Sequence, residues 1–316
     1  MNILLLGGCG YIGSKLHGWL TNAGHFVEVV DIDWFGNPAK LSRFTTDYNQ
    51  IQSAFVHKFN AVILLAGHSS VKMCEGNLVG CFNNNVRNFV NFLPKLNGQK
   101  FIYASSSSVY GNIEMLEVDE ACRTYIPNNY YDLSKSEIDH YSQLYPGLNY
   151  YGLRFGTVNG SSPNLRPELM LNAMTLSAMK ARKINVFNPE IARPILGIND
   201  LCRAVEAILN GPDAPGIYNL ASFNSRVSEI AQKIGKLMDA EIVVHENPPE
   251  QIDNVKTQTK AYDFSINCEK FKKTFNFKFN DTVESIVHDV WEKETDMIEQ
   301  TKRPQHLTRN LAIKYI

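Results

Sequence analysis

The chain has 316 residues, with 31 basic and 32 acidic side chains and a formal net charge of −1. Hydrophobic residues make up 44% and charged residues 20%, so the chain can bury a large core and is not expected to be disordered. The near-neutral charge argues against a nucleic-acid partner. The longest apolar run, residues 61–66, is far shorter than the ~20 residues that span a bilayer, so no membrane segment is expected.

Cysteine usage narrows the class of protein further. The six cysteines form no C-x-x-C pair, and a chain of this size does not need disulfide staples, so neither a zinc site nor a secreted scaffold is expected. Cys74 and Cys122 are interpreted as buried or idle thiols. The first residues contain no basic leader. Together these features favour a soluble, cytoplasmic α/β protein, an enzyme, with no metal.

Short apolar strands alternate with helices through the first half of the chain. Strands are predicted over 2–6, 26–31, 61–66, 101–104 and 150–154. Helices are predicted over 14–24, 79–96 and 131–144, and the second has one apolar face made of Phe82, Val86, Phe89, Val90 and Leu93. This alternation predicts a parallel, doubly wound sheet.

The pattern of predicted elements changes after Gly160. Helices are predicted over 169–179, 199–209 and 226–238, strands over 217–220 and 241–244, and a last helix from Asp281. The prediction is a dinucleotide-binding domain over 1–160, rejoined by residues 193–212, and a smaller α/β substrate-binding domain over 161–316.

A glycine-rich segment joins the first strand to the first helix. Residues 7–13 fit G-x-G-x-x-G from Gly8 and G-x-x-G-x-x-G from Gly7. Such a loop lets the backbone approach a pyrophosphate at the N-terminus of a helix. Asp31 closes the next strand, where it can accept hydrogen bonds from a ribose and would repel a 2′-phosphate, so NAD is favoured over NADP. The alternative is a glycine-rich turn of another βα fold.

Tyr131 and Lys135 lie four residues apart on one predicted helix face. An ammonium, together with the cationic nicotinamide, lowers the pKa of a tyrosine and makes it a usable base. The serine run 105–108 follows a strand and can orient the same substrate oxygen. Tyr130 is a weaker candidate because its i+4 neighbour is Ser134. The alternative is an exposed pair that arose by chance.

These segments together resemble one family. The chain resembles the extended short-chain dehydrogenase/reductases, in the NAD-dependent nucleotide-sugar epimerase/dehydratase family. The segments that carry this resemblance are residues 7–13, Asp31, 65–67, 84–86, 105–111, Tyr131 with Lys135, 153–156 and 193–194. The resemblance covers residues 1–210 well and the remainder thinly. It implies a Rossmann fold, NAD as cofactor, a nucleotide-diphosphate sugar as substrate, and a homodimer formed by the Tyr-Lys helix and its neighbour, with Val86, Phe89 and Phe92 as candidate contacts.

The resemblance also implies roles for individual residues. The catalytic residues are Ser106, Tyr131 and Lys135, and the substrate-binding residues are Ser106, Ser107, Thr157, Asn172 and Arg193. The cofactor-binding residues are Gly7, Gly10, Tyr11, Ile12, Gly13, Asp31, Asp33, Asp47, Tyr48, Leu65, Ala66, Gly67, Asn84, Tyr131, Lys135 and Gly156.

Two serines decide between reactions within this family. The 4,6-dehydratases have an Asp-Glu pair after the catalytic hydroxyl, whereas this chain has Ser107 and Ser108, which cannot perform the elimination. The leading hypothesis is an epimerase that works through a transient keto sugar. The alternatives are a net NAD(H)-dependent oxidoreductase and a non-catalytic dinucleotide-binding protein. His68 is interpreted as a loop residue without a chemical role, and Asp139 and His140 as solvated.

Overall fold

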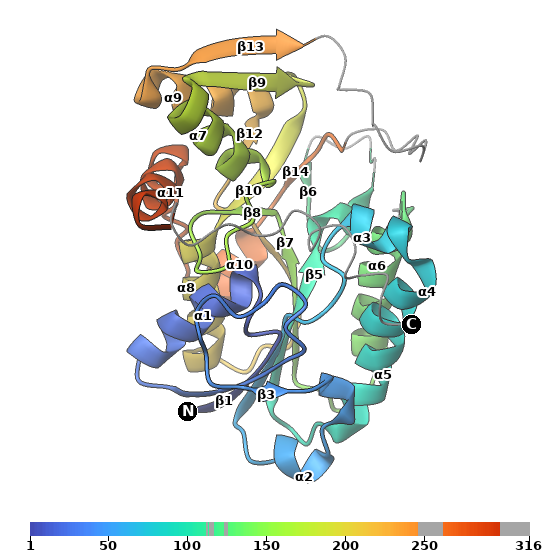
Figure 1. The fold of residues 1–316 in the computed structure, drawn as a ribbon. Coiled ribbons are helices and arrows are strands. Elements are labelled where there is room, and N and C mark those ends of the chain that lie inside the picture. Colours follow the sequence, from blue (N-terminus) through green and yellow to red (C-terminus); the bar gives the residue numbers. More distant parts are fainter. Residues whose placement is uncertain (112, 114–116, 123–125, 246–261, 298–316) are drawn as a thin grey trace.

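The computed structural model describes residues 1–111, 113, 117–122, 126–245 and 262–297 (Figure 1). Residues 246–261 and 298–316 belong to the predicted substrate-binding part and lie outside this description.

A seven-stranded parallel sheet forms the centre of the molecule, in the order β11-β7-β5-β4-β1-β2-β3. Its strands are β1 (Asn2–Leu6), β2 (Phe26–Asp31), β3 (Phe44–Thr45), β4 (Ala61–Leu64), β5 (Lys100–Ser106), β7 (Tyr150–Phe155) and β11 (Gly216–Leu220). The side chains of Ile3 to Leu6 are fully buried, as the apolar run predicts for a strand covered on both faces. The prediction of a doubly wound α/β fold is confirmed.

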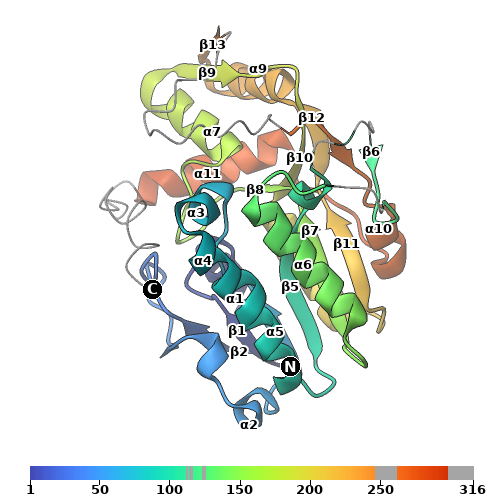
Figure 2. The ribbon, with the colours of Figure 1, turned by 90° about the vertical axis from the view of Figure 1, so that its right-hand side faces the viewer.

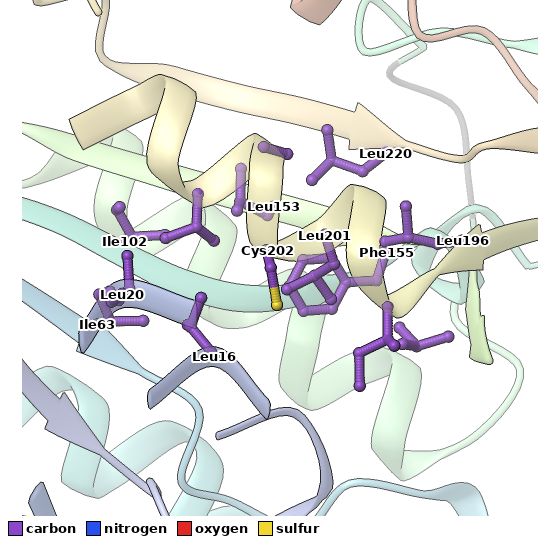
Figure 3. Packing of buried hydrophobic residues seen from close by; sticks show 14 of the residues in the cluster. Leu16, Leu20, Ile63, Ile102, Leu153, Phe155, Leu196, Leu201, Cys202 and Leu220 are labelled. Atoms are coloured by element: carbon purple, nitrogen blue, oxygen red, sulfur yellow. The ribbon is translucent and has the colours of Figure 1, made fainter. Parts of the chain in front are cut away.

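Helices cover both faces of this sheet (Figure 1). On one face lie α1 (Tyr11–Asn22) and α8 (Ile198–Asn210), and on the other lie α5 (Asn88–Phe92) and α6 (Tyr130–Leu144). Figure 3 shows the first interface, where helix side chains meet those of the central strands: Leu16, Leu20, Leu201, Cys202, Ile63, Ile102 and Leu153. Residues 198–210 and 216–220 therefore build part of the large-sheet layer.

The predicted helix over 79–96 is interrupted. The structure has α4 (Leu78–Cys81), the π-helical turn η2 (Phe82–Arg87), α5 and the 3-10 turn η3 (Leu93–Lys95). A π turn is wider than an α turn, so it moves Phe82 off the buried face, and Phe82 is 58% exposed. Val86, Phe89 and Phe92 are buried in the core of their own chain. The prediction that these three contact a second chain is wrong.

A second α/β layer lies beyond the carboxyl ends of the large sheet (Figure 2). It contains the sheet β12-β10-β8 and the parallel pair β13-β9. Its strands are β8 (Thr157–Asn159), β9 (Lys183–Phe187), β10 (Ala192–Gly197), β12 (Phe223–Arg226) and β13 (Glu241–His245), and its helices are α7 (Met170–Ala181), α9 (Val227–Met238) and α11 (Val283–Met297). A third pair, β6 (Glu117–Val118) with β14 (Ser265–Ile266), and α10 (Glu269–Phe275) complete the side that carries β11.

Cys74 and Cys81 form a disulfide. Cys74 lies in α3 (Val71–Gly76) and Cys81 in α4, and the two short helices meet at Asn77, which brings the two Cα atoms within 5.0 Å. Cys74 is buried as expected, but the interpretation of it as a thiol is wrong. Across the described ranges, no helix is long and apolar enough to cross a membrane, and no group of three His, Cys, Asp or Glu side chains could hold a metal ion.

Candidate active site

A cavity of about 1130 Å³ lies at the carboxyl ends of β1, β2, β4, β5 and β7. The second layer closes its far side with Arg193, Tyr262 and Phe264. Parallel α/β sheets bind their ligands at this edge. The volume is large enough for two extended ligands side by side.

The glycine segment between β1 and α1 forms one wall of the cavity. Gly7 has a φ of 89°, and a Cβ there would lie 2.5 Å from the Ala66 nitrogen. A Cβ on Gly13 would lie 2.2 Å from the Gly7 carbonyl oxygen. The first amides of α1 have no intrahelical partner and border the cavity at Gly10, Tyr11 and Ile12. This backbone cradle fits a pyrophosphate.

Asp31 lies at the end of β2 beside this cradle. Its Oδ2 accepts the Cys9 N–H and its Oδ1 accepts the Asp33 N–H, both at 2.8 Å. Each carboxylate oxygen keeps a second lone pair for a ribose hydroxyl. Asp33, predicted to face the same ribose, does not line the cavity and instead forms an ion pair with Arg43.

The remaining predicted cofactor positions converge on the same wall. Asp47 caps the 3-10 turn η1 (Tyr48–Gln50), and the Tyr48 hydroxyl donates to the Asn84 carbonyl at 3.2 Å. Asn84 lies on the π turn and lines the cavity. Four further predicted residues also line the cavity: Leu65, Ala66, Gly67 and Gly156. The π turn thus brings an amide side chain to the cavity, a common use of this irregularity.

His68, which the sequence interpretation took for a loop residue without a chemical role, lines the cavity. It is 2% exposed, and its ring lies edge-on to Trp34 with 5.1 Å between centroids. Its Nδ1 lies 3.2 Å from the Asn84 amide nitrogen, while its buried Nε2 has no hydrogen-bond partner within the described chain. Burial and the Lys135 charge lower the pKa of His68 to about 4, so the ring is neutral at pH 7. Its position after a strand end was the available signal.

Lys135 and Tyr131 meet at the opposite wall, as their spacing predicts. The Lys135 Nζ lies 5.8 Å from the centre of the Tyr131 ring and donates to the Ala104 carbonyl at 2.8 Å. Burial lowers the pKa of Lys135 to about 8, and the charge of Asp139 opposes this shift. The ammonium is therefore mostly charged at pH 7.

Tyr131 is held near Ser106 and Arg166. Burial raises its pKa, whereas a hydrogen bond with Ser106 and the positive charge of Arg166 lower it. The protein groups alone therefore leave Tyr131 protonated at pH 7, and the lowering of its pKa that the sequence predicts would need the charge of a bound nicotinamide. Arg166 lines the cavity, pairs with Glu168 at 2.7 Å and approaches Ser69. No sequence pattern singled out Arg166.

Asp139 lies on α6 and is fully buried, so the interpretation of it as solvated is wrong. Its carboxylate accepts hydrogen bonds from Arg154 Nε at 2.8 Å, the Ser105 hydroxyl at 3.0 Å and the Tyr103 hydroxyl at 3.1 Å. These donors lie on β5 and β7, so the pair ties α6 to the sheet. His140, the next residue, is exposed as expected.

Four of the five predicted substrate positions line the cavity: Ser106, Ser107, Thr157 and Arg193. The Arg193 guanidinium lies over the Tyr262 ring at 5.6 Å, and within the described residues no carboxylate lies within 4 Å of it. Asn172 is not at the cavity. It is fully buried, its Oδ1 accepts the Gly160 N–H, and its Nδ2 donates to the Arg166 carbonyl.

A family model described as the NAD dependent epimerase/dehydratase family matches residues 3–221. The chain belongs to this family. The cofactor of this epimerase/dehydratase family member is NAD, and the glycine cradle and Asp31 fit it. When bound, NAD would supply reversible hydride transfer.

Known members are similar over much of their length. Protein CapI of Staphylococcus aureus is 29% identical over 240 residues, which cover 68% of this chain and 71% of CapI. The dTDP-glucose 4,6-dehydratase 1 of Escherichia coli (strain K12) is 25% identical over 328 residues, 90% of each chain. The crystal structure of UDP-glucuronic acid 4-epimerase from Bacillus cereus, in complex with UDP-glucuronic acid and NAD, has a TM-score of 0.79 and 19% identity, and the match covers 94% of this chain and all of that one. The last similarity confirms the fold.

Proposed function

We propose that the protein is an epimerase that acts on a nucleotide-diphosphate sugar. The observation that supports this most directly is the convergence of Tyr131, Lys135 and Ser106 on the cavity that the glycine cradle also lines. In this proposal the large-sheet layer binds the dinucleotide and the second layer binds the sugar nucleotide.

Each of the three residues has a distinct task in this proposal. NAD would be held by the glycine cradle, Asp31 and Lys135, and would supply reversible hydride transfer at the sugar carbon. Tyr131 removes the proton from the hydroxyl on that carbon and later gives it back. Lys135 holds the nicotinamide ribose and stabilises the phenolate by its charge. Ser106 orients the reacting oxygen.

Dehydration is disfavoured although a dehydratase is among the relatives. Elimination of water needs an acid and a base besides Tyr131. The two positions after Ser106 carry Ser107 and Ser108, which cannot fill these roles because neither hydroxyl titrates in the useful range. Epimerisation needs no such pair.

Arg166 favours a sugar with an anionic group. Arg193 is the cation available to the diphosphate, and a planar guanidinium suits that task. Arg166 lines the same cavity as Tyr131 and its charge lowers the pKa of Tyr131, so in this proposal it lies near the reacting part of the sugar. The Bacillus cereus enzyme is described with UDP-glucuronic acid. We therefore expect turnover of a uronate to exceed that of its neutral hexose, and Arg166→Leu to remove roughly 10- to 100-fold of this preference.

The test is turnover of sugar nucleotides with a catalytic amount of NAD, followed by separation of the epimers. Tyr131→Phe is expected to lower turnover by about 10²–10⁴-fold while NAD binding is retained, because a general base is lost. Tyr130→Phe is the matched control, since Tyr130 is the neighbouring tyrosine and is 52% exposed. Near-normal turnover by Tyr131→Phe would exclude this mechanism.

The alternatives make different predictions for the same assay. A net oxidoreductase would consume NADH in proportion to substrate, whereas an epimerase recycles the cofactor. A dinucleotide-binding protein without activity would bind NAD and convert no sugar nucleotide.

The proposal includes a homodimer formed by α4, η2 and α6. These elements expose several large apolar side chains along one side of the molecule: Leu78, Val79, Phe82, Leu133, Tyr141 and Leu144. Exposed apolar clusters of this kind are typical of protein–protein interfaces. They replace the buried residues that the sequence interpretation had chosen.

A further inference from the structure

Arg193 reaches the cavity without an acidic partner to hold its side chain. The residue is half-buried, and in the part of the chain that the structure describes it forms no ion pair. Its guanidinium instead lies over the Tyr262 ring, with 5.6 Å between Cζ and the ring centre. Both side chains line the cavity. An aromatic ring attracts a guanidinium without neutralising it, so the charge of Arg193 stays available to an anion.

The Tyr262 side chain is fixed at its hydroxyl end. The hydroxyl donates to Oδ2 of Asp132 at 2.7 Å and accepts from the Asn129 side-chain amide at 2.5 Å. Asn129 also donates to the same oxygen of Asp132 at 2.9 Å, and its own Oδ1 caps α6 by accepting the Asp132 N–H at 3.0 Å. Asp132 is fully buried. The Tyr262 hydroxyl therefore belongs to a closed set of hydrogen bonds in the first turn of the helix that carries Tyr131.

The residues after Tyr262 join the same segment to β10. The Asp263 carboxylate accepts the Ala192 N–H at 2.8 Å, and Ala192 directly precedes Arg193 at the start of β10. Phe264 is 4% exposed, and its ring meets the Tyr262 ring edge-on with 6.2 Å between centroids. The Tyr262 ring is therefore held by contacts that do not involve Arg193, and it forms a fixed support for the guanidinium.

We propose that Tyr262 is a positioning residue for the diphosphate of the sugar nucleotide. Its ring places the Arg193 guanidinium in the cavity, and its hydroxyl ties that ring to Asp132 in the catalytic helix. An arginine side chain has several rotatable bonds, so a guanidinium that is placed in advance loses less entropy when it binds a phosphate. This rests on the proposed function in taking Arg193 as the cation that binds the diphosphate.

The test is calorimetric binding of ADP, CDP, GDP, UDP and dTDP to the protein saturated with NAD, continued with the diphosphate that binds most tightly. Tyr262→Leu removes the ring and the hydroxyl and should weaken this binding about 10-fold, because the cation–π contact that holds Arg193 is lost. Tyr262→Phe keeps the ring and removes only its tie to Asp132, so it should weaken binding by about 3-fold.

The decisive measurement repeats Tyr262→Leu in a protein that carries Arg193→Gln. Because Tyr262 is proposed to act through Arg193, its substitution should change the affinity by less than about 2-fold in that background. A purely structural role of Tyr262 would instead weaken binding equally in both backgrounds. Tyr262→Phe gives the same comparison if Tyr262→Leu does not fold.

Tyr130→Leu is the matched control, because it makes the same substitution at a tyrosine that is 52% exposed, begins α6 and does not line the cavity. It should bind the diphosphate as the unmodified protein does. Undiminished binding by Tyr262→Leu, or an equal loss in both backgrounds, would overturn the positioning role and leave the proposed function standing. Binding that behaves as expected in a protein that converts no sugar nucleotide would contradict only the proposed epimerase. Failure of every diphosphate to bind the unmodified protein would contradict both.

Discussion

Lys135 carries its charge in a buried position, and this has a measurable cost. Because the pKa of its ammonium falls to about 8 in the folded chain, from 10.5, the charged form destabilises the fold at pH 7. Lys135→Met should therefore raise the free energy of unfolding at pH 7 by up to about 3 kcal/mol, since one pKa unit corresponds to about 1.4 kcal/mol. Turnover should be lost.

The gain should shrink as the pH rises from 8 towards 10.5, because the folded protein then releases the proton before the unfolded chain does. Denaturant unfolding at several pH values measures this. A destabilised Lys135→Met at pH 7 would contradict it, and would show that the bond to the Ala104 carbonyl outweighs the burial.

His68 should make stability depend on pH in the acidic range. Its folded pKa of about 4 lies below the usual 6.5, so the unfolded chain binds a proton first as the pH falls. The contribution of neutral His68 is present above pH 6.5 and is lost between about 6.5 and 4. In His68→Phe, which keeps an aromatic ring against Trp34, the melting temperature should fall less over this range. If the melting temperatures of the two proteins fall equally over this pH range, the prediction is wrong.

At the scale of elements, the Asp139–Arg154 pair fixes α6 to the sheet. Asp139→Asn leaves the buried Arg154 charge uncompensated and should destabilise the fold by roughly 3–5 kcal/mol. His140→Ala alters the next, exposed position and should change stability by less than about 0.5 kcal/mol. Chemical denaturation compares them. A loss below about 1 kcal/mol for Asp139→Asn would contradict this prediction, and would mean that the hydrogen bonds with Ser105 and Tyr103 hold α6 to the sheet without the ion pair.

Comparison of the predicted and observed sites shows which contacts can be predicted from the sequence. The glycine cradle and the Tyr131–Lys135 pair were predicted from spacing within one loop or helix, and Asp31 from its place at the end of the next predicted strand. Asp139 was misjudged because its donors come from two strands that only the folded sheet brings to it.

The π turn was missed for a related reason. Hydrophobic periodicity assumes one helical pitch, and Phe82 falls on the apolar face only if that pitch is kept.

Asn172 and Asp33 were assigned to the site by resemblance. Each instead contacts another group of the chain, Asn172 the Gly160 N–H and Asp33 the Arg43 side chain, and the resemblance does not specify these partners.

At the scale of the whole molecule, the exposed side chains of α4 and η2 predict the oligomeric state. Val79, whose side chain is 68% exposed, lies on the proposed dimer surface, and Val79→Asp places a charge there that should give a monomer without unfolding the chain. Val244→Asp, on β13, is the matched control because Val244 is 57% exposed in the second layer. Light scattering across a range of concentrations measures the mass. A monomeric unmodified protein, or a dimeric Val79→Asp, would contradict the proposal.

The edge strand β11 has a consequence for how the chain is made. It pairs with β7, yet it leaves the ribosome only after β8, β9 and β10 of the second layer. Until then the emerging protein exposes the backbone of β7 as an open edge, a site where nascent chains pair wrongly and aggregate. The large sheet therefore cannot be completed during synthesis until β8, β9 and β10 have been made, and a chain cut off after residue 160 should accumulate as insoluble material.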